Sequence, residues 1–261
     1  MGQKRKFLKQ FQPALQKYSP TATYIDLFGG SGLLSHTVKS LYPDATVIYN
    51  DFDNYRERLM NIEKTNCLIS ELREILHDYL PDNKIIGNTR DLVLLRIKQA
   101  QNDGYVDYIT LSSNLLFSMN YACNFETFEK ETLYNCIRKS NYVATNYLDG
   151  LEITNKCYKD LFNQYKDVPN VIFLVDPPYL STETGTYKSF WKLRDYLDVL
   201  QVLDGTSYFY FTSNKSSIIE LCEWIETKTP MSNPFTGAYT ETMNTSVNYA
   251  SSYTDIMIYK T

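Results

Sequence analysis

Short apolar runs alternate with amphipathic segments along most of this chain of 261 residues. The clearest run is 171–175, where five consecutive apolar residues precede an acid and two prolines. A continuous apolar run of this length is typical of a strand that is buried on both faces of a parallel sheet. Further strands are predicted at 23–28, 46–49, 151–154, 207–212 and 254–259.

Amphipathic segments between these runs predict helices at 7–18, 33–41, 158–165, 192–203 and 216–226. From residue 54 the pattern becomes mostly helical, with helices expected at 55–79, 89–100 and 125–138. Residues 106–124 have no clear pattern, and the polar segments 141–150, 181–189 and 231–252 indicate loops. The alternation predicts an α/β, Rossmann-like fold formed by residues 1–53 and 151–261, with a mostly helical lobe inserted at 54–150.

The strand at 171–175 ends in the sequence Asp176-Pro177-Pro178-Tyr179. Proline has no amide hydrogen and a fixed φ, so the ladder stops and the chain leaves the sheet at its carboxyl edge. In an open α/β sheet, ligands bind at this edge. A carboxylate, backbone carbonyls and an aromatic ring can there hold a flat ring that bears an amino group. A Pro-Pro turn without any function is the alternative interpretation.

A glycine loop follows the first predicted strand. Residues 28–32 (Phe-Gly-Gly-Ser-Gly) let the backbone approach a ligand, and they direct amide hydrogens of the next helix at a negative group. Asp51 ends the second strand, where a carboxylate can accept hydrogen bonds from both hydroxyls of a ribose. Alone, the pattern fits NAD, FAD, S-adenosylmethionine or a plain helix cap. The loop is shorter than GxGxxG, which favours a cofactor without a pyrophosphate.

Together, the loop, Asp51 and Asp176-Pro177-Pro178-Tyr179 resemble the adenine-N6 DNA methyltransferases of the Dam type. In that family the cofactor loop, the target-recognition lobe and the DPPY motif follow one another in this order, and a later Ser-Asn corresponds to Ser213-Asn214. The resemblance covers most of the chain as an architecture, while identity is confined to these motifs. It implies S-adenosylmethionine as cofactor, double-stranded DNA as partner and methylation of adenine N6.

The resemblance also implies site residues. Those expected to bind the cofactor are Asp26, Phe28, Gly29, Gly30, Ser31, Gly32, Asp51, Tyr158 and Asp176. Those expected to be catalytic are Asp176, Pro177 and Tyr179, and those expected to contact the nucleic acid are Pro178 and Tyr179. Four basic residues are expected to contact the nucleic acid as well, with ordinary solvated charge as the alternative: Arg138, Lys139, Lys188 and Lys192.

Three departures from the family pattern stand out. The family's N-terminal Lys-Trp-x-Gly-Gly-Lys survives at best as residues 2–4, Gly-Gln-Lys, without the tryptophan. The basic residues of this N-terminal stretch otherwise suggest only a solvated end. Cys157-Tyr158 stands where the family commonly has an Asp followed by an aromatic residue that packs on the cofactor adenine. The inserted lobe lacks the family's usual recognition sequences, which leaves the target sequence open.

The chemistry explains the composition of the DPPY motif. An aromatic amine is a poor nucleophile because its lone pair is conjugated with the ring. Two acceptors, the Asp176 carboxylate and the Pro177 carbonyl, would favour a tetrahedral nitrogen whose lone pair points at the methyl group. Asp176 would act mainly as an orienting acceptor, since an ordinary Asp has a pKa of about 3.9. Tyr179 would stack on a base flipped out of the duplex.

Charge and composition limit these expectations. The formal net charge of −4 argues against a strongly basic nucleic-acid binder, so basic residues would have to gather on one face. The N-terminal segment or Arg138-Lys139, together with Lys188 and Lys192, are the expected contributors. The 23 tyrosines favour a base-stacking surface, although tyrosine as core filler explains them equally well.

The remaining composition suggests a cytoplasmic protein. The five cysteines are scattered without a CxxC pair, which indicates reduced thiols and no zinc or other metal site. No apolar run approaches the length of a membrane span, and the N-terminus lacks an apolar signal region. The expected role is in restriction, host defence or phage modification, and the oligomeric state is open. Two alternatives remain: the same chemistry on RNA, or a catalytically silent nucleic-acid-binding or partner-binding protein of this fold.

Overall fold

The computed structural model describes residues 3–117, 120–178, 191–228, 232–248 and 251–261. The chain forms two compact units: unit 1 contains Met1–Tyr55 and Tyr147–Thr261, and unit 2 contains Arg56–Asn146. Two segments far apart in the sequence therefore build unit 1, and unit 2 is inserted between them. The target-recognition role expected for the inserted part stays a prediction.

Unit 1 is built on a seven-stranded sheet with the order β3-β2-β1-β4-β5-β7-β6. The strands are β1 (Thr23–Asp26), β2 (Thr46–Asn50), β3 (Glu152–Thr154), β4 (Val171–Val175), β5 (Ser207–Ser213), β6 (Tyr239–Asn248) and β7 (Ser251–Lys260). The first five are parallel, whereas β7 is antiparallel to both of its neighbours. This topology confirms the expected Rossmann-like α/β fold.

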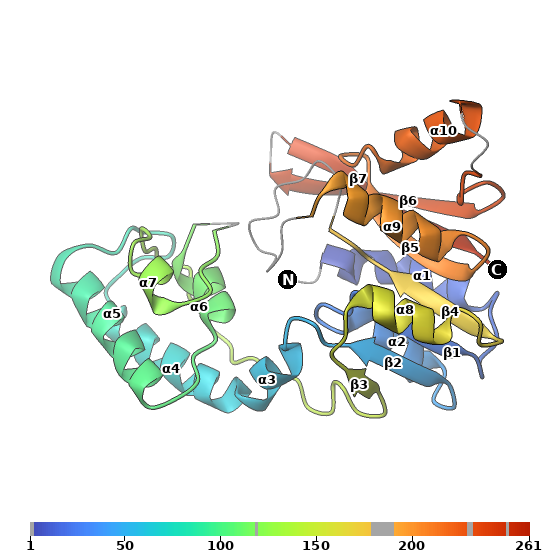
Figure 1. Ribbon diagram of the computed structural model, residues 1–261. Helices are drawn as coiled ribbons and strands as arrows, with labels where there is room; N and C mark the ends of the chain where they lie inside the picture. Colours follow the sequence, from blue (N-terminus) through green and yellow to red (C-terminus); the bar gives the residue numbers. More distant parts are fainter. Residues whose placement is uncertain (1–2, 118–119, 179–190, 229–231, 249–250) are drawn as a thin grey trace. The chain divides into compact units, whose positions relative to one another are not determined.

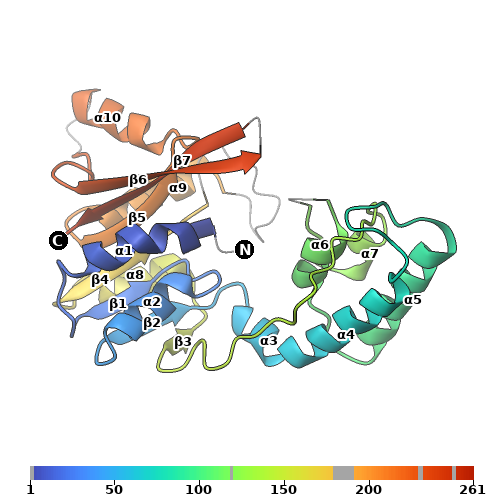
Figure 2. The ribbon, with the colours of Figure 1, turned by 180° about the vertical axis from the view of Figure 1, so that it is seen from behind.

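Helices cover both faces of this sheet (Figures 1 and 2). The helices of unit 1 are α1 (Leu8–Leu15), α2 (Leu33–Leu41), α8 (Tyr158–Tyr165), α9 (Leu193–Leu203) and α10 (Ile218–Lys228). In β4, Ile172 and Leu174 pack in the cluster that contains α1 and α2, whereas Phe173 and Val175 pack in the cluster that contains α8 and α9. Alternate side chains of a strand point to opposite faces, so an apolar run is needed where both faces are covered.

The N-terminal segment packs on the sheet through two phenylalanines. A short 3₁₀ helix, η1 (Gln3–Phe7), leads directly into α1. Phe7 and Phe11 are fully buried, and their rings meet Phe211 and Phe209 edge to face, with centroids 6.1 and 4.9 Å apart. The helix expected at 7–18 is thus α1, which ends at Leu15 and is preceded by η1, and Phe7 fixes η1 to the sheet.

Unit 2 is helical and has its own apolar core. Its helices are α3 (Tyr55–Met60), α4 (Ile62–Ile75), α5 (Gly87–Asn102), α6 (Tyr108–Leu115) and α7 (Phe125–Phe128), the first residue of α3 belonging to unit 1. The single helix expected at 55–79 is thus two helices. No helix in the described ranges combines the length and the apolar character that a membrane span requires.

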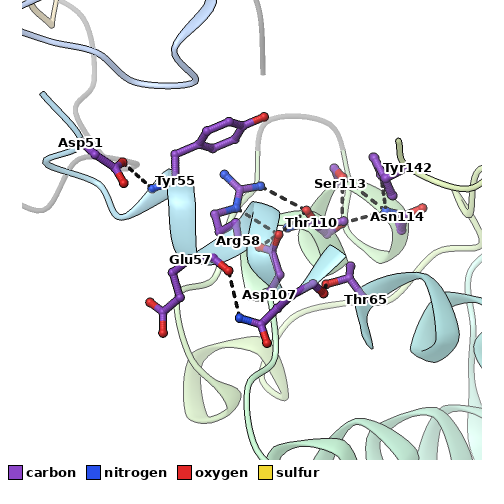
Figure 3. Close-up of polar contacts among 11 residues, drawn as sticks. Asp51, Tyr55, Glu57, Arg58, Thr65, Asp107, Thr110, Ser113, Asn114 and Tyr142 are labelled. Carbon is purple, nitrogen blue, oxygen red and sulfur yellow. Dashed lines mark hydrogen bonds and ion pairs between the residues drawn. The ribbon is translucent and has the colours of Figure 1, made fainter. Parts of the chain in front are cut away.

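An ion pair between half-buried Arg58 and buried Asp107 joins α3 to the N-cap of α6 inside unit 2 (Figure 3). Arg58 Nε lies 2.9 Å from Oδ2 of Asp107, whose Oδ1 accepts a hydrogen bond from the backbone amide of Thr110 at the start of α6. Arg58 also donates to the hydroxyl of Thr110 at 3.1 Å. A charge-assisted cap of this kind fixes where α6 begins. The local sequence pattern did not indicate α6 within 106–124, because Arg58, which pairs with Asp107, lies 49 residues before it in the sequence.

Two predicted segments are wrong. The helix expected at 125–138 ends at Phe128, and the following residues are extended, with Leu133 and Tyr134 bridged to Leu116 and Lys84. The segment 231–252, expected as a loop, contains β6, which pairs with β7. An edge strand with a solvent-exposed face can be polar, and Thr and Tyr are good strand formers, so polarity alone misled the prediction.

Alanine substitution should affect stability differently at two glycines, Gly29 in the loop after β1 and Gly205 in a later turn. A Cβ on Gly29 would lie 2.2 Å from the buried ring of Tyr49 and 2.7 Å from the backbone oxygen of Asn50. Gly29→Ala should therefore lower the free energy of unfolding by about 3 kcal/mol. Gly205 has a φ of +70° but open space around it, so Gly205→Ala should cost only about 1–2 kcal/mol. Equilibrium unfolding in urea measures both, and equal losses would contradict the packing argument.

Candidate active site

The strand order places several polar residues at one edge of the sheet. The order reverses between β1 and β4, which are adjacent in the sheet but far apart in the chain. Asp26 ends β1, Asp51 follows β2 and Asp176 follows β4. In open α/β sheets this switch point at the carboxyl edge is where ligands bind. The structure thus brings together the three acids that the sequence predicted for the site, and the negative charge of Asp176 acts on Asp26.

The glycine loop forms a tight turn before α2. Gly32 N donates to Gly29 O at 2.7 Å, and Gly30 and Gly32 have positive φ values of +50° and +69°. The hydroxyl of Tyr49 donates to the backbone oxygen of Gly30 at 2.8 Å. Ser31 is half-buried in this turn. Gly32 is the N-cap of α2 and offers no side-chain bond to the first amides of the helix. These features give a ligand close access to the backbone.

Asp26 is almost completely buried at this edge. Its side chain receives a hydrogen bond from Ser35 Oγ at 2.7 Å on Oδ2, whereas Oδ1 has no hydrogen-bond partner in the described part of the chain. Burial raises the pKa of Asp26 to about 7; the Ser35 hydrogen bond opposes this rise, and the negative charge of Asp176 adds to it. A buried carboxylate with an unpartnered oxygen is a suitable acceptor for a cationic group.

Asp51 is buried and already organises the chain around it (Figure 3). Its Oδ1 accepts a hydrogen bond from Tyr55 N at 2.6 Å, at the start of α3, and one from the hydroxyl of Tyr49 at 3.1 Å. The backbone oxygen of Asp51 accepts from Asn155. The residue is therefore a structural cap as well as a candidate for binding a ribose.

Aromatic rings from three segments meet beside the glycine loop. Phe28 lies 4.9 Å from Tyr158 and 5.6 Å from Trp191, measured between ring centroids. Tyr158 and Trp191 are nearly parallel, at 21° and 5.8 Å. All three residues are half-buried. Flat apolar faces of this kind suit an adenine ring. The sequence indicated Phe28 and Tyr158 for the cofactor, and the structure adds Trp191 to them.

Asp176 meets a cation that the sequence did not predict. Lys4 Nζ lies 3.3 Å from Oδ1 of Asp176 and 3.8 Å from Oδ1 of Asp255. Burial raises the pKa of Asp176 above its usual value, and the Lys4 ammonium limits that rise. Lys4 is itself buried, so the expectation that the basic N-terminal residues form a solvated end is wrong for Lys4. Pro177 and Pro178 are buried beside Asp176.

The expected nucleic-acid contacts are distributed over both units. Tyr179 and Lys188 lie outside the described residues. Lys192 is exposed and begins α9, where its backbone amide donates to Asp195 Oδ2 at 2.8 Å. Arg138 and Lys139 are exposed in unit 2; the Arg138 guanidinium lies 4.1 Å from the ring centroid of Tyr142 and donates to Ser140 Oγ. Their contacts with nucleic acid stay predictions.

Two signals in the sequence could have indicated the missed residues. Asp255 is the one acid in the apolar strand predicted at 254–259, and a buried acid needs a partner. Lys4 occupies the last position of the shortened N-terminal motif. In the described part of the chain, no group of three or more His, Cys, Asp or Glu side chains is arranged to hold a metal ion.

Comparisons with known proteins place the chain in a family. Residues 1–217 match the family described as D12 class N6 adenine-specific DNA methyltransferase. The chain is 37% identical over 269 residues to a Haemophilus influenzae protein named "Putative methyltransferase", an alignment that spans 100% of this chain and 90% of that protein. A crystal structure titled "putative methylase", also from Haemophilus influenzae, covers 97% of this chain and 88% of its own, with 10% identity and a TM-score of 0.36. The last likeness is too weak to support an argument.

The raised pKa of Asp26 predicts how the stability of the ligand-free protein varies with pH. The ordinary pKa is 3.8 and the folded one about 7, so the folded state binds the proton more tightly. The associated stabilisation is fully present below about pH 4 and is lost as pH rises through 7, a change of up to roughly 4 kcal/mol. Asp26→Asn should remove this loss, so the variant should gain stability relative to the native chain between about pH 4 and 8.

Urea unfolding at several pH values measures this difference. Ser35→Ala provides the matched comparison, because losing the hydrogen bond that favours the ionised carboxylate should move the pH window upward. A difference between Asp26→Asn and the native chain that stays constant from pH 4 to 8 would show that Asp26 does not titrate as described.

Proposed function

The chain belongs to the D12 class N6 adenine-specific DNA methyltransferase family, and we propose that it transfers a methyl group from S-adenosylmethionine to the exocyclic N6 of adenine in double-stranded DNA. The observation that carries the proposal is the position of Asp176: a partly exposed carboxylate at the switch point of the sheet, next to a glycine loop and a second, buried acid. S-adenosylmethionine supplies an activated methyl group on a sulfonium.

The residues of this edge suit the parts of that cofactor. The unpartnered oxygen of Asp26 would accept from its α-ammonium, and the carboxylate of Asp51 would accept from its ribose hydroxyls. Phe28, Tyr158 and Trp191, whose rings contact one another, would together form an aromatic wall on which its adenine packs. Gly30, where a Cβ would have only the Phe28 oxygen within 4 Å, would let it approach the backbone.

The DPPY residues would then prepare the target amine. Asp176 and the backbone carbonyl of Pro177 would accept the two amine hydrogens, which aligns the nitrogen lone pair with the methyl group. The same two acceptors stabilise the positive charge that the nitrogen acquires during transfer. Asp176 orients and stabilises, because the Lys4 ammonium beside it favours its ionised form. Tyr179 would stack on the flipped base.

A nucleoside assay tests the proposal directly. The protein is incubated with methyl-labelled S-adenosylmethionine and either duplex DNA or RNA of mixed sequence, and the product is digested to nucleosides. We expect label in N6-methyldeoxyadenosine from the DNA, and Asp176→Ala should reduce it to background while the protein remains folded. Label only in N6-methyladenosine from RNA would favour an RNA substrate. Labelling of neither nucleic acid would favour a silent binding protein.

A second prediction concerns the ribose contact. Asp51→Asn keeps an oxygen that can accept from Tyr55 N, so α3 should remain capped and thermal unfolding should change little. The amide has one acceptor oxygen where the carboxylate has two, so the affinity for S-adenosylmethionine should fall roughly tenfold, or about 1.4 kcal/mol. Isothermal calorimetry measures this change. An unchanged affinity in a folded variant would exclude Asp51 from the ribose site.

A further inference from the structure

The ammonium of Lys4 lies between two carboxylates that come from different strands of unit 1. Asp176 follows β4, and Asp255 belongs to β7. The Asp176 side chain is 26% exposed, whereas that of Asp255 is only 1% exposed and that of Lys4 9%. A substrate can therefore reach Asp176, while Asp255 is enclosed by protein and can act on the site only through its neighbours.

The antiparallel direction of β7 brings Asp255 to the carboxyl edge of the parallel strands. Asp255 is in register with Ser213 at the end of β5. The next residue, Asn214, fixes this end of β7: its backbone amide donates to Thr254 O, and its Oδ1 accepts from Thr254 N, both at 2.9 Å. The backbone at Asp255 is thus held by pairing with β5 and by the two hydrogen bonds between Asn214 and the preceding residue, Thr254. The Ser213-Asn214 pair noted in the sequence thereby acquires a structural role.

Aromatic packing on Phe211 fixes the position of Lys4. Phe7, in the same 3₁₀ helix, packs edge to face on Phe211, and Lys4 Nζ lies 5.4 Å from the centroid of that ring. An ammonium buried in this way requires opposite charge nearby. The carboxylate of Asp176 alone could provide this opposite charge. A second carboxylate at 3.8 Å, with almost no exposure, instead defines where the ammonium sits relative to the first.

The position of the ammonium matters for Asp176. An ammonium donates hydrogen bonds and cannot accept them, so Lys4 on Oδ1 assigns the other oxygen of Asp176 to a different donor. An N6 amine is such a donor. Lys4 also lowers the pKa of Asp176 against the effect of burial, whereas the negative charge of Asp255 raises it. Asp255 therefore has two opposing effects: its charge disfavours ionisation of Asp176, and its hold on Lys4 favours it.

We propose that Asp255 is a positioning residue for methyl transfer, which holds the Lys4 ammonium on Oδ1 of Asp176 and so orients that carboxylate toward the target amine. The inference rests on the proposed function, because the orientation of Asp176 serves catalysis only if an amine binds there. The competing interpretation is a structural ion pair that secures η1 to the sheet and leaves the reaction unaffected.

Steady-state kinetics distinguish these interpretations. Asp255→Ala should lower kcat for methyl transfer roughly 10- to 100-fold per folded molecule. The affinity for S-adenosylmethionine and the KM for DNA should stay within about twofold, since Asp255 touches neither ligand. Asp255→Asn keeps an oxygen that can hold the ammonium and should restore kcat to within about fivefold. A fall in stability with kcat unchanged would show that the pair is only structural.

Lys17→Met is the matched control for Lys4→Met. Lys17 also places its ammonium against β7, where it donates to the hydroxyl of Tyr259 and lies over the ring of Tyr239. Tyr259 is in register with Phe209, whereas Asp255 is in register with Ser213, so the two lysines contact opposite ends of the strand pair. Lys4→Met should abolish most of the activity, and Lys17→Met should leave kcat unchanged. An equal loss in both variants would overturn the assignment.

A titration of Asp176 tests the inference without any activity. Asp residues are labelled with ¹³C at the carboxyl carbon, and the NMR signal of Asp176, assigned with Asp176→Asn, is followed against pH. The charged and titratable groups acting on Asp176 are Lys4, Asp255, Asp26 and the hydroxyl of Tyr210. If Asp255 holds Lys4 in place, Asp255→Ala should raise the pKa of Asp176 by about one unit or more, because the ammonium moves away.

The opposite sign would overturn the inference. If Asp255 acts on Asp176 only through its negative charge, Asp255→Ala should lower the pKa of Asp176. Asp255→Asn should lower this pKa under either interpretation, because it removes the charge and keeps an oxygen that can hold Lys4. Asp255→Ser, which is too short to reach the ammonium, replaces the alanine variant if that variant does not fold. A native chain that methylates nothing would refute the proposed function, and the sign of this titration would still decide whether Asp255 positions Lys4.

Discussion

The main constraint on unit 1 is electrostatic, because its sheet must accommodate three carboxylates, those of Asp26, Asp176 and Asp255, at one edge. The parallel strands β1 and β4 bring Asp26 and Asp176 to this edge, and the antiparallel pairing of β7 with β5 brings Asp255 there. Lys4 is a buried lysine, and its ammonium contacts two of the three acids. The edge therefore carries more negative than positive charge when the acids are ionised. A ligand with cationic groups would relieve this repulsion, and its binding would stabilise the fold by the same interactions.

The glycine loop and the second acid are coupled to the same architecture through Tyr49. Its ring leaves no room for a side chain at position 29, and its hydroxyl donates both to the Gly30 oxygen and to Asp51 Oδ1. Asp51 in turn caps α3, the helix in which unit 1 meets unit 2 in the sequence. The loop expected to approach a cofactor, the acid expected to hold its ribose and the start of the inserted unit thus share one buried side chain. Local geometry at the site and stability of the fold cannot vary independently here.

The sequence predicted those parts of the structure that depend on local pattern. The run at 171–175 and the helices at 33–41 and 158–165 match the observed elements, because apolar periodicity reflects which faces are covered. The failures share a different origin. The residues after Phe128 are extended and β6 is a strand because of partners far along the chain, and Lys4 is buried because two acids 172 and 251 residues later require it. Such partners leave no trace in a local window of sequence.

The acidic composition looks different once burial is known. The formal net charge of −4 counts every ionisable residue. Among the described residues, four aspartates (Asp26, Asp51, Asp107 and Asp255) are buried, against one buried lysine, Lys4. These acids face the interior or a half-buried arginine, as Asp107 does in unit 2, so their charges act only weakly on phosphates in solution. The surface is accordingly less acidic than the whole chain. The basic residues that a duplex requires therefore have fewer exposed acids to overcome than the composition suggests.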